Sequence, residues 1–131
     1  MRAVGIIIRN KKILLIHRIK DGKEYYVFPG GAIEEGESSK EAVIREIKEE
    51  LSIDRVIIDR FLFQIENQGN KEFYYLIKDF SGQPKLGGEE KERVNQDNQY
   101  YPIWLDLDKI QSLDNLYPKE ARLKVTKETR H

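Results

Sequence analysis

The sequence has no cysteine, and it contains only four prolines and one tryptophan in 131 residues. The absence of cysteine excludes disulfide bonds and thiolate metal sites. No apolar run approaches the roughly 18 residues that a membrane-spanning helix needs. The short apolar run from Ala3 to Ile8 carries no signal-peptide cleavage pattern. These absences lead us to expect a soluble, cytoplasmic protein without a membrane partner.

An excess of charge of either sign is also missing, because 23 basic and 23 acidic residues give a formal net charge of zero. Proteins that follow a nucleic-acid backbone usually carry a strongly basic surface, so we expect no stable nucleic-acid partner. The length and an apolar content of 39% fit one globular domain over residues 1–131. The sequence does not distinguish a monomer from a homodimer.

The first third of the chain contains short apolar runs that predict β-strands. Ala3–Ile8 and Ile13–Ile16 are almost uninterrupted, which is typical of strands covered on both faces, and the polar residues between them predict a hairpin. A charged loop over Ile19–Glu24, with its turn at Asp21 and Gly22, is expected next. Tyr25–Phe28 then predicts a short strand that leads into a Pro-Gly-Gly turn.

The second half of the chain predicts a similar mixture of strands and helices. The alternating pattern places Phe61, Phe63 and Ile65 on one side of their strand. The expected elements are strands over Arg55–Gln68, Glu72–Phe80 and Tyr100–Leu105, a short helix within Asp106–Leu116, and a final helix from Pro118 to Lys127. Strands covered on both faces by helices predict an α/β fold, a three-layer α/β/α sandwich with a mixed β-sheet.

The most informative stretch runs from Gly30 to Ile53. Ser38 and Glu41 form a capping box, in which each side chain can bond the backbone N–H of the other residue. No glycine or proline follows before Leu51, so the pattern predicts a helix of three to four turns. At about 100° per residue, one sector of this helix is apolar, with Val43, Ile44, Ile47 and Leu51.

A second sector of the same helix carries Glu46, Glu49 and Glu50, which are neighbours at i, i+3 and i+4 spacing. Like charges at this spacing repel one another. A hard divalent cation such as Mg²⁺ relieves that repulsion, because Mg²⁺ binds carboxylate oxygens and keeps water or phosphate oxygens in its shell. The alternative is a solvent-exposed acidic face, which is the usual reason for a run of charge.

The wider pattern resembles the signature of the Nudix hydrolase family, in its MutT-type form. Both spacings of that signature match, and one position departs, because Ser52 stands where the family usually has a glycine that caps the helix. The matching positions are Gly31, Glu37, Arg45, Glu46, Glu49, Glu50 and Ile53. Outside residues 30–53 the likeness is one of layout and not of fixed residues.

The resemblance implies a hydrolase that cleaves the diphosphate linkage of a nucleoside diphosphate derivative, such as a nucleoside triphosphate, with a metal-activated water. It implies Mg²⁺ as the cofactor, with Mn²⁺ as an alternative, and a small nucleotide-type substrate as the partner. The metal ligands would be Glu46, Glu49, Glu50 and Glu37, together with a backbone group of Gly31. In this interpretation Arg45 orients a carboxylate, and Gly30 and Gly31 approach the substrate. The alternatives are a surface ion pair for Arg45 and an ordinary tight turn for the glycines.

The sequence leaves the general base and the substrate open. Glu49 or Glu46 could accept the proton, and so could an acid of the irregular segment 81–98, where Glu90 or Glu92 is favoured by position among Glu89, Glu90, Glu92 and Asp97. Nucleoside triphosphates, dinucleoside polyphosphates and nucleotide sugars all fit. The candidates for stacking on a base are Tyr25, Tyr26, Phe28, Phe73, Tyr74 and Trp104. The alternative function is a catalytically silent Nudix-like domain that binds or senses a nucleotide.

Overall fold

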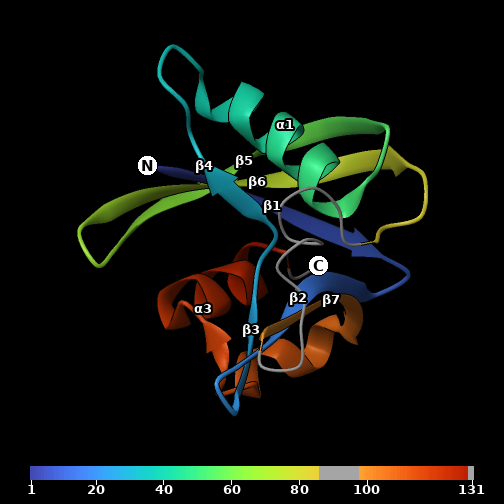
Figure 1. Cartoon of the computed structure of the whole chain (residues 1–131), viewed down its shortest axis with the longest axis vertical. Helices are drawn as coiled ribbons and strands as arrows, with labels where there is room; N and C mark the ends of the chain where they lie inside the picture. The colour runs from blue at the N-terminus through green and yellow to red at the C-terminus, as the bar shows by residue number, and fades with distance from the viewer. Residues whose placement is uncertain (86–97, 130–131) are drawn as a thin grey trace.

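The computed structural model describes residues 1–85 and 98–129, and within them a mixed β-sheet lies between helices (Figure 1). None of the described helices is both long and apolar enough to cross a membrane. The helices are α1 Ser39–Leu51, the 3₁₀ helix η1 Leu107–Ser112, and α3 Lys119–Glu128. The strands are β1 Arg2–Arg9, β2 Lys12–Lys20, β3 Lys23–Val27, β4 Gly30–Ala32, β5 Arg55–Asn67, β6 Asn70–Ser81, β7 Asn98–Asp106 and β8 Leu116–Tyr117.

Strand β1 is the centre of the sheet and shares one of its edges between two partners. Along its first edge, β1 pairs with β6 in parallel orientation. On the second edge, residues 2–4 pair with β4, whereas Ile8 and Arg9 pair with Ile13 and Lys12 of β2. Strands β1 and β2 are therefore joined only beside their turn, and the sheet forks beyond it into the halves β5-β6-β1-β4 and β7-β2-β3-β8.

Helix α1 covers one face of the sheet with the apolar sector that the sequence predicts. Val43, Ile47 and Leu51 are fully buried, in a cluster with Ile7 and Ile77 from the strands. A Cβ atom at Gly5 of β1 would lie 2.8 Å from Cδ1 of Ile47, so the glycine lets Ile47 pack directly on the strand. Burial of each such side chain is worth about 1.5–3 kcal/mol.

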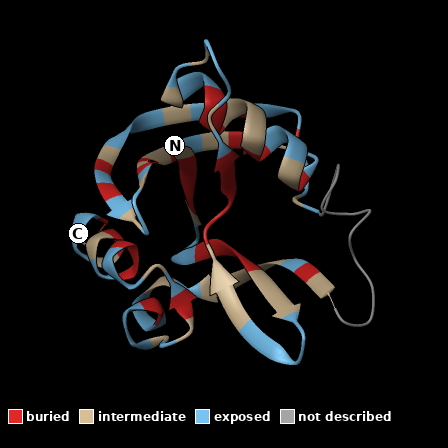
Figure 2. Cartoon of the chain, turned by 60° about the vertical axis from the view of Figure 1, so that its left-hand side comes forward, coloured by how far each residue is buried: buried red, intermediate tan, exposed pale blue. Residues whose placement is uncertain are grey.

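The opposite face is covered by η1 and α3. Ala121 and Val125 of α3 are fully buried and belong to one cluster with Leu15, Ile110 and Leu116. Figure 2 shows the buried residues along the strands between the two helical layers. Together with the mixed pairing of the strands, this arrangement confirms the predicted three-layer α/β/α sandwich.

Four local predictions were wrong. The glycines of the expected Pro-Gly-Gly turn are not in a turn, because Gly30 and Gly31 pair with β1 as part of strand β4. The expected loop over Ile19–Glu24 is a tight turn at Asp21 and Gly22, both with positive φ, because β2 and β3 continue pairing up to it. The expected helix within Asp106–Leu116 is the shorter η1 without a side-chain cap, and Leu116 instead pairs with β3. Phe61 is exposed and contacts Tyr75, since bulges in β5 interrupt the alternation that would place it beside Phe63.

The boundaries of α1 agree with the prediction. Both hydrogen bonds of the capping box between Ser38 and Glu41 are present. Ser52 ends the helix in the left-handed conformation, with φ of 52° and ψ of 40°. The serine thus takes the backbone shape that a glycine adopts more easily at this position.

Candidate active site

The floor of the candidate site is strand β4, which lies directly under the acidic sector of α1. A Cβ atom at Gly31 would lie 2.2 Å from Oε2 of Glu46, and one at Gly30 would lie 2.3 Å from the carbonyl oxygen of Ala3. The N–H of Gly30 donates to Oε1 of Glu50 at 3.3 Å. Gly31 therefore leaves room for the carboxylate of Glu46 against β4, whereas Gly30 allows β4 to approach β1 closely and bonds Glu50 through its N–H.

Arg45 gathers the other carboxylates around its guanidinium group. Its Nε donates to Oε2 of Glu37 at 2.7 Å, and its Nη1 donates to Oε1 of Glu46 at 2.8 Å and to Oε2 of Glu49 at 3.2 Å. Its Nη2 donates to the carbonyl oxygen of Ala32 at 3.0 Å. Arg45 thus links the loop before α1, the helix and β4, which is more than a pairwise surface ion pair provides.

These hydrogen bonds shift the pKa values of both partners. The hydrogen bonds from Arg45, followed by the one from the N–H of Glu34, lower the pKa of Glu37 from 4.5 to about 2. The pKa of Arg45 is raised, chiefly by its hydrogen bond to Glu37. Glu37 is therefore a carboxylate at any physiological pH, and it holds Arg45 in place.

The structure brings together some of the predicted site residues and separates others. Glu37, Glu46 and Glu49 surround Arg45, whereas Glu50 contacts the N–H of Gly30 and lines a cavity next to it. Within residues 1–85 and 98–129, no three acidic or histidine side chains converge closely enough to hold a metal ion. Glu90 and Glu92 lie outside the described residues.

The donor set nevertheless fits a hard divalent cation. Glu46 and Glu50 bring carboxylate oxygens to the backbone of Gly31 and Gly30. Carboxylate oxygens are among the ligands that Mg²⁺ and Mn²⁺ take. A side chain at Gly31 would displace the carboxylate of Glu46 from this position.

Beside Glu50, a cavity of about 100 Å³ opens at the fork of the sheet. Arg18 of β2 lines it, donating from Nη2 to the hydroxyl of Tyr100 at 2.6 Å, with its guanidinium 4.3 Å from the centre of that ring. Its buried Nε has no hydrogen-bond partner among the described residues. Arg2, Phe28 and Gly30 complete the wall next to Glu50. A free arginine donor beside the acidic helix suits a phosphate-bearing ligand.

A neighbouring cavity of about 230 Å³ shares Arg2, Arg18 and Phe28 with the first. Its remaining walls include Asn67, Glu72, Tyr74, Tyr117 and Pro118, which come from β5, β6, β8 and the residue that precedes α3. The two cavities together form a cleft, here called the fork cleft, which leads from Glu50 towards Glu72. Phe28 and Tyr74 are among the aromatic residues proposed for stacking, and both line this cleft.

Sequence reasoning missed Arg2, Arg18, Tyr100 and Glu72, which lie on four different strands. Residues so distant in sequence give no local signal, because only the strand order places them together. His17 is engaged outside this cleft, where its Nε2 lies 2.7 Å from Oε1 of Glu24 and its ring stacks on Tyr26.

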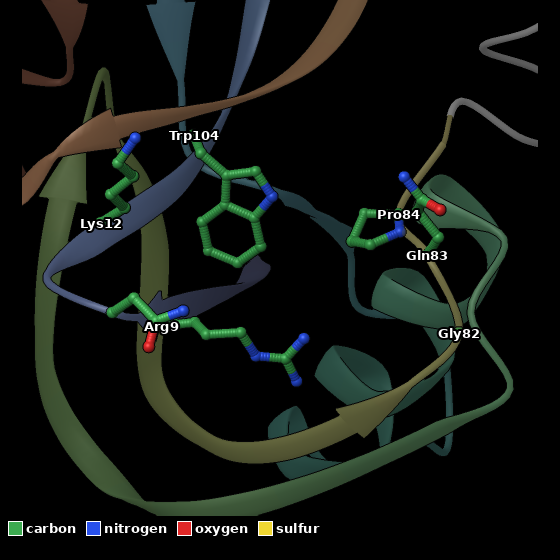
Figure 3. A pocket seen from close by; sticks show the side chains of 7 residues that line it. Arg9, Lys12, Gly82, Gln83, Pro84 and Trp104 are labelled. Carbon is green, nitrogen blue, oxygen red and sulfur yellow. The ribbon is translucent and has the colours of Figure 1, made fainter.

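A separate cavity of about 540 Å³ lies near the β1–β2 turn (Figure 3). Trp104 forms one wall and faces Pro84, while Arg9 and Lys12 also line the cavity. The Arg9 guanidinium lies 4.0 Å from the centre of the Phe80 ring. No carboxylate lines this cavity among the described residues, so they provide no oxygen-rich metal site there.

Comparisons with known proteins agree with this geometry. The family model described as NUDIX domain matches residues 1–125. The chain is 28% identical to an RNA pyrophosphohydrolase from Orientia tsutsugamushi strain Boryong, over 92% of this chain and 82% of that protein. It is 34% identical to an 8-oxo-dGTP diphosphatase from Haemophilus influenzae, over 63% of this chain and 65% of that protein.

The solved structures give the same result for the fold. The solution structure of the E. coli ORF135 protein matches with a TM-score of 0.71 and 24% identity, over 95% of this chain and 85% of that one. The agreement in fold supports the sequence match over almost the whole chain. The protein therefore belongs to the NUDIX family and is a Nudix hydrolase.

Proposed function

We propose that residues 1–131 act as one Mg²⁺-dependent pyrophosphohydrolase that cleaves the diphosphate linkage of a nucleoside diphosphate derivative. The observation that carries this proposal is the packing of Glu46 and Glu50 on the backbone of Gly31 and Gly30, at the mouth of the fork cleft. Carboxylates in such close contact with a glycine backbone, beside two arginines, suit a ligand that combines a metal ion with phosphate groups.

The helix carboxylates Glu46, Glu49 and Glu50 would hold the metal, with Glu37 and the carbonyl oxygen of Gly31 as further donors. When bound, the metal supplies charge neutralisation of the diphosphate and a lower pKa for a bound water. Arg45 positions Glu46 and Glu49 through its hydrogen bonds at 2.8 and 3.2 Å. A bound metal ion would compete with Arg45 for the carboxylate oxygens of Glu46 and Glu49.

Arg18 and Arg2 would bind the substrate from the opposite wall of the fork cleft. The Nε of Arg18 lacks a partner among the described residues, and its other end is fixed by Tyr100. A phosphate oxygen at that Nε would satisfy a buried donor that otherwise costs about 1–3 kcal/mol. Phe28 and Tyr117 offer ring surfaces for a nucleobase farther along the cleft.

In the reaction, a water oxygen forms a bond to one phosphorus while the bridging P–O bond breaks, and a proton leaves the water. We assign the acceptance of this proton to Glu49, because its side chain is 58% exposed and can reach an incoming water. Glu46 is 19% exposed and is packed on Gly31, which suits a fixed ligand better than a mobile base. Glu90 and Glu92 remain alternatives from outside the described residues.

The two relatives broaden the range of substrates to be tested. One is named for action on RNA and the other for action on 8-oxo-dGTP. A suitable panel contains ordinary and 8-oxo nucleoside triphosphates, dinucleoside polyphosphates, ADP-ribose, nucleotide sugars and a short RNA with a 5′-triphosphate. Each is incubated with the protein and Mg²⁺, or with a chelator, and the products are separated by chromatography.

The expected result is Mg²⁺-dependent release of a nucleoside monophosphate, or of a 5′-monophosphorylated RNA, from one substrate class. Turnover that persists in the chelator would contradict the metal assignment. Binding of a nucleotide without turnover of any panel member would favour the alternative, a catalytically silent nucleotide-binding domain.

A further inference from the structure

One acidic side chain of the fork cleft has no part in the proposed hydrolysis. Glu72 of β6 is 4% exposed and lines the cavity that begins at Arg18. Its Oε1 accepts a hydrogen bond from the hydroxyl of Tyr74 at 2.8 Å, and its Oε2 accepts one from Nδ2 of Asn67 at 3.1 Å. A carboxylate offers about four acceptor positions, so these two partners use half of its capacity.

Arg2 stands beside Glu72 at the paired position of β1, but it makes no close ion pair with it. Among the described residues, no lysine, arginine or histidine nitrogen lies within 4.0 Å of its oxygens, although Arg2 and Arg18 line the same cavity. Buried carboxylates are normally paired or fully hydrogen-bonded. Burial, followed by the nearby Glu72, raises the pKa of Tyr74, so the tyrosine hydroxyl stays a donor to Glu72. The remaining acceptor capacity is therefore available to a ligand in the cavity.

The ligand that suits this arrangement is flat and presents two adjacent N–H donors. Phe28 and Tyr117 border the cavity with aromatic rings, and Tyr117 is 51% exposed at its rim. Guanine presents N1–H beside its 2-amino group, so it can donate twice to one carboxylate. Adenine places the acceptor N1 beside its 6-amino group, which would bring a lone pair against a carboxylate oxygen.

We propose that Glu72 is a specificity-determining residue, which selects a guanine-type base by accepting hydrogen bonds from its N1–H and 2-amino groups. The inference rests on the proposed function in that it places the base of the same substrate in the fork cleft. Asn67 and Tyr74 hold the carboxylate of Glu72 from the protein side. The arginines remain free to bind the phosphates nearer to Glu50.

The test measures binding without turnover, by calorimetric titration of GDP, IDP and ADP into the protein in the presence of a chelator. IDP lacks the 2-amino group and so removes one of the two hydrogen bonds. The expected order of affinity is GDP, IDP and then ADP, with GDP about tenfold to a hundredfold tighter than ADP. A wild-type protein that binds ADP as tightly as GDP would overturn the proposal without any variant being made.

Glu72→Gln provides the second arm, because a carboxamide offers one acceptor and one donor, the pattern that matches adenine. The preference for GDP over ADP is expected to fall below about twofold or to reverse. Glu66→Gln, an exposed change on β5, should keep the wild-type preference. Thermal unfolding of both variants verifies that they are folded. A Glu72→Gln protein that is folded and retains the preference would overturn the assignment.

The outcomes also separate this inference from the proposed function. Selective binding of GDP that depends on Glu72, without hydrolysis of any substrate, would support the base site and contradict the hydrolase proposal. Hydrolysis with equal kcat/KM for guanine and adenine substrates would support the hydrolase proposal and contradict the base site.

Discussion

Helices α1 and α3 cover opposite faces of one sheet and use similar small and branched apolar residues to do so. Ala42, Val43 and Ile47 of α1 are fully buried, as are Ala121 and Val125 of α3. Their outer surfaces differ. That of α1 presents carboxylates linked by Arg45 above two glycines, whereas that of α3 presents a mixture of lysine, glutamate and the exposed Leu123.

The arginines of the two helices also differ in the groups to which they donate hydrogen bonds. Arg45 makes four of its hydrogen bonds to the carboxylates of Glu37, Glu46 and Glu49 and a fifth to the carbonyl of Ala32. Arg122 is 6% exposed and donates to the carbonyl oxygen of Leu113, so it connects α3 to the end of η1. Apolar packing therefore decides where each helix lies, and the polar outer residues decide what chemistry it can support.

The largest effect is expected from Gly31→Ala. The added Cβ would overlap the carboxylate of Glu46, which must then move by more than about 1 Å. A displacement of that size can cost about 100-fold in rate, so kcat/KM should fall by about 100-fold or more. The measurement is steady-state hydrolysis of the substrate found in the panel.

Gly69→Ala is the matched control for this change, because Gly69 lies in the β5–β6 turn with no atom within 4 Å of its added Cβ. Its positive φ of 80° predicts a loss of stability and unchanged hydrolysis per folded molecule. Wild-type activity in Gly31→Ala would contradict the role given to the contact between β4 and Glu46.

Replacing Arg45 or Arg122 by methionine should change different properties of the protein, which are activity for Arg45 and stability for Arg122. Arg45→Met releases carboxylates that the site uses, and we expect about a 10- to 100-fold loss of activity. Arg122→Met leaves the part-buried carbonyl of Leu113 without its side-chain donor, and we expect about 1–3 kcal/mol loss of stability with little change in kcat. Activity assays and urea unfolding of both variants provide the comparison. A loss of stability without loss of activity in Arg45→Met, together with a loss of activity in Arg122→Met, would contradict the comparison.

The pKa of Glu37 gives a smaller and more local test. Because its pKa in the folded protein is lowered to about 2, its contribution to stability is present above about pH 4.5 and is lost as the pH falls towards 2. Carbon-detected NMR titration should give a pKa of about 2 for Glu37 in the wild type and a clearly higher pKa in Arg45→Met, where the N–H of Glu34 still donates to the carboxylate. An unchanged value in the variant would show that Arg45 is not the cause.

The smallest effect is expected from Ser52→Gly at the end of α1. The left-handed backbone of Ser52 costs about 1 kcal/mol more for serine than for glycine, partly offset by the larger unfolded-state entropy of glycine. We expect stabilisation by roughly 0.5 kcal/mol and unchanged activity. Thermal unfolding would measure it, and a lower midpoint than that of the wild type would contradict the strain at this position.

Local signals allowed most of this architecture to be predicted. The capping box at Ser38 and Glu41 and the apolar sector of α1 depend on neighbours within a turn or two, and the structure contains both. The bulges of β5 depend on pairing with β6 and leave no mark in the sequence pattern, which is why that pattern misplaces Phe61. The sequence pattern likewise predicts a helix that includes Leu116, but Leu116 pairs with β3 in the sheet.

The candidate site likewise has one part that the sequence predicts and one part that it does not. The carboxylates lie on one loop and helix, so their spacing along the chain is enough to group them. The fork cleft is built from Arg2, Arg18, Glu72 and Tyr100 on four strands, and it exists because β1 and β2 separate after two paired positions. No local pattern encodes that separation.

The most direct test of the central claim compares three proteins in one assay of Mg²⁺-dependent hydrolysis. These are the wild type, Glu49→Gln on the outer face of α1, and Glu128→Gln on the exposed end of α3. We expect Glu49→Gln to lose at least about 100-fold in kcat while remaining folded, and Glu128→Gln to match the wild type. Full activity in a folded Glu49→Gln protein would contradict the assignment of the acidic face of α1 as the active site.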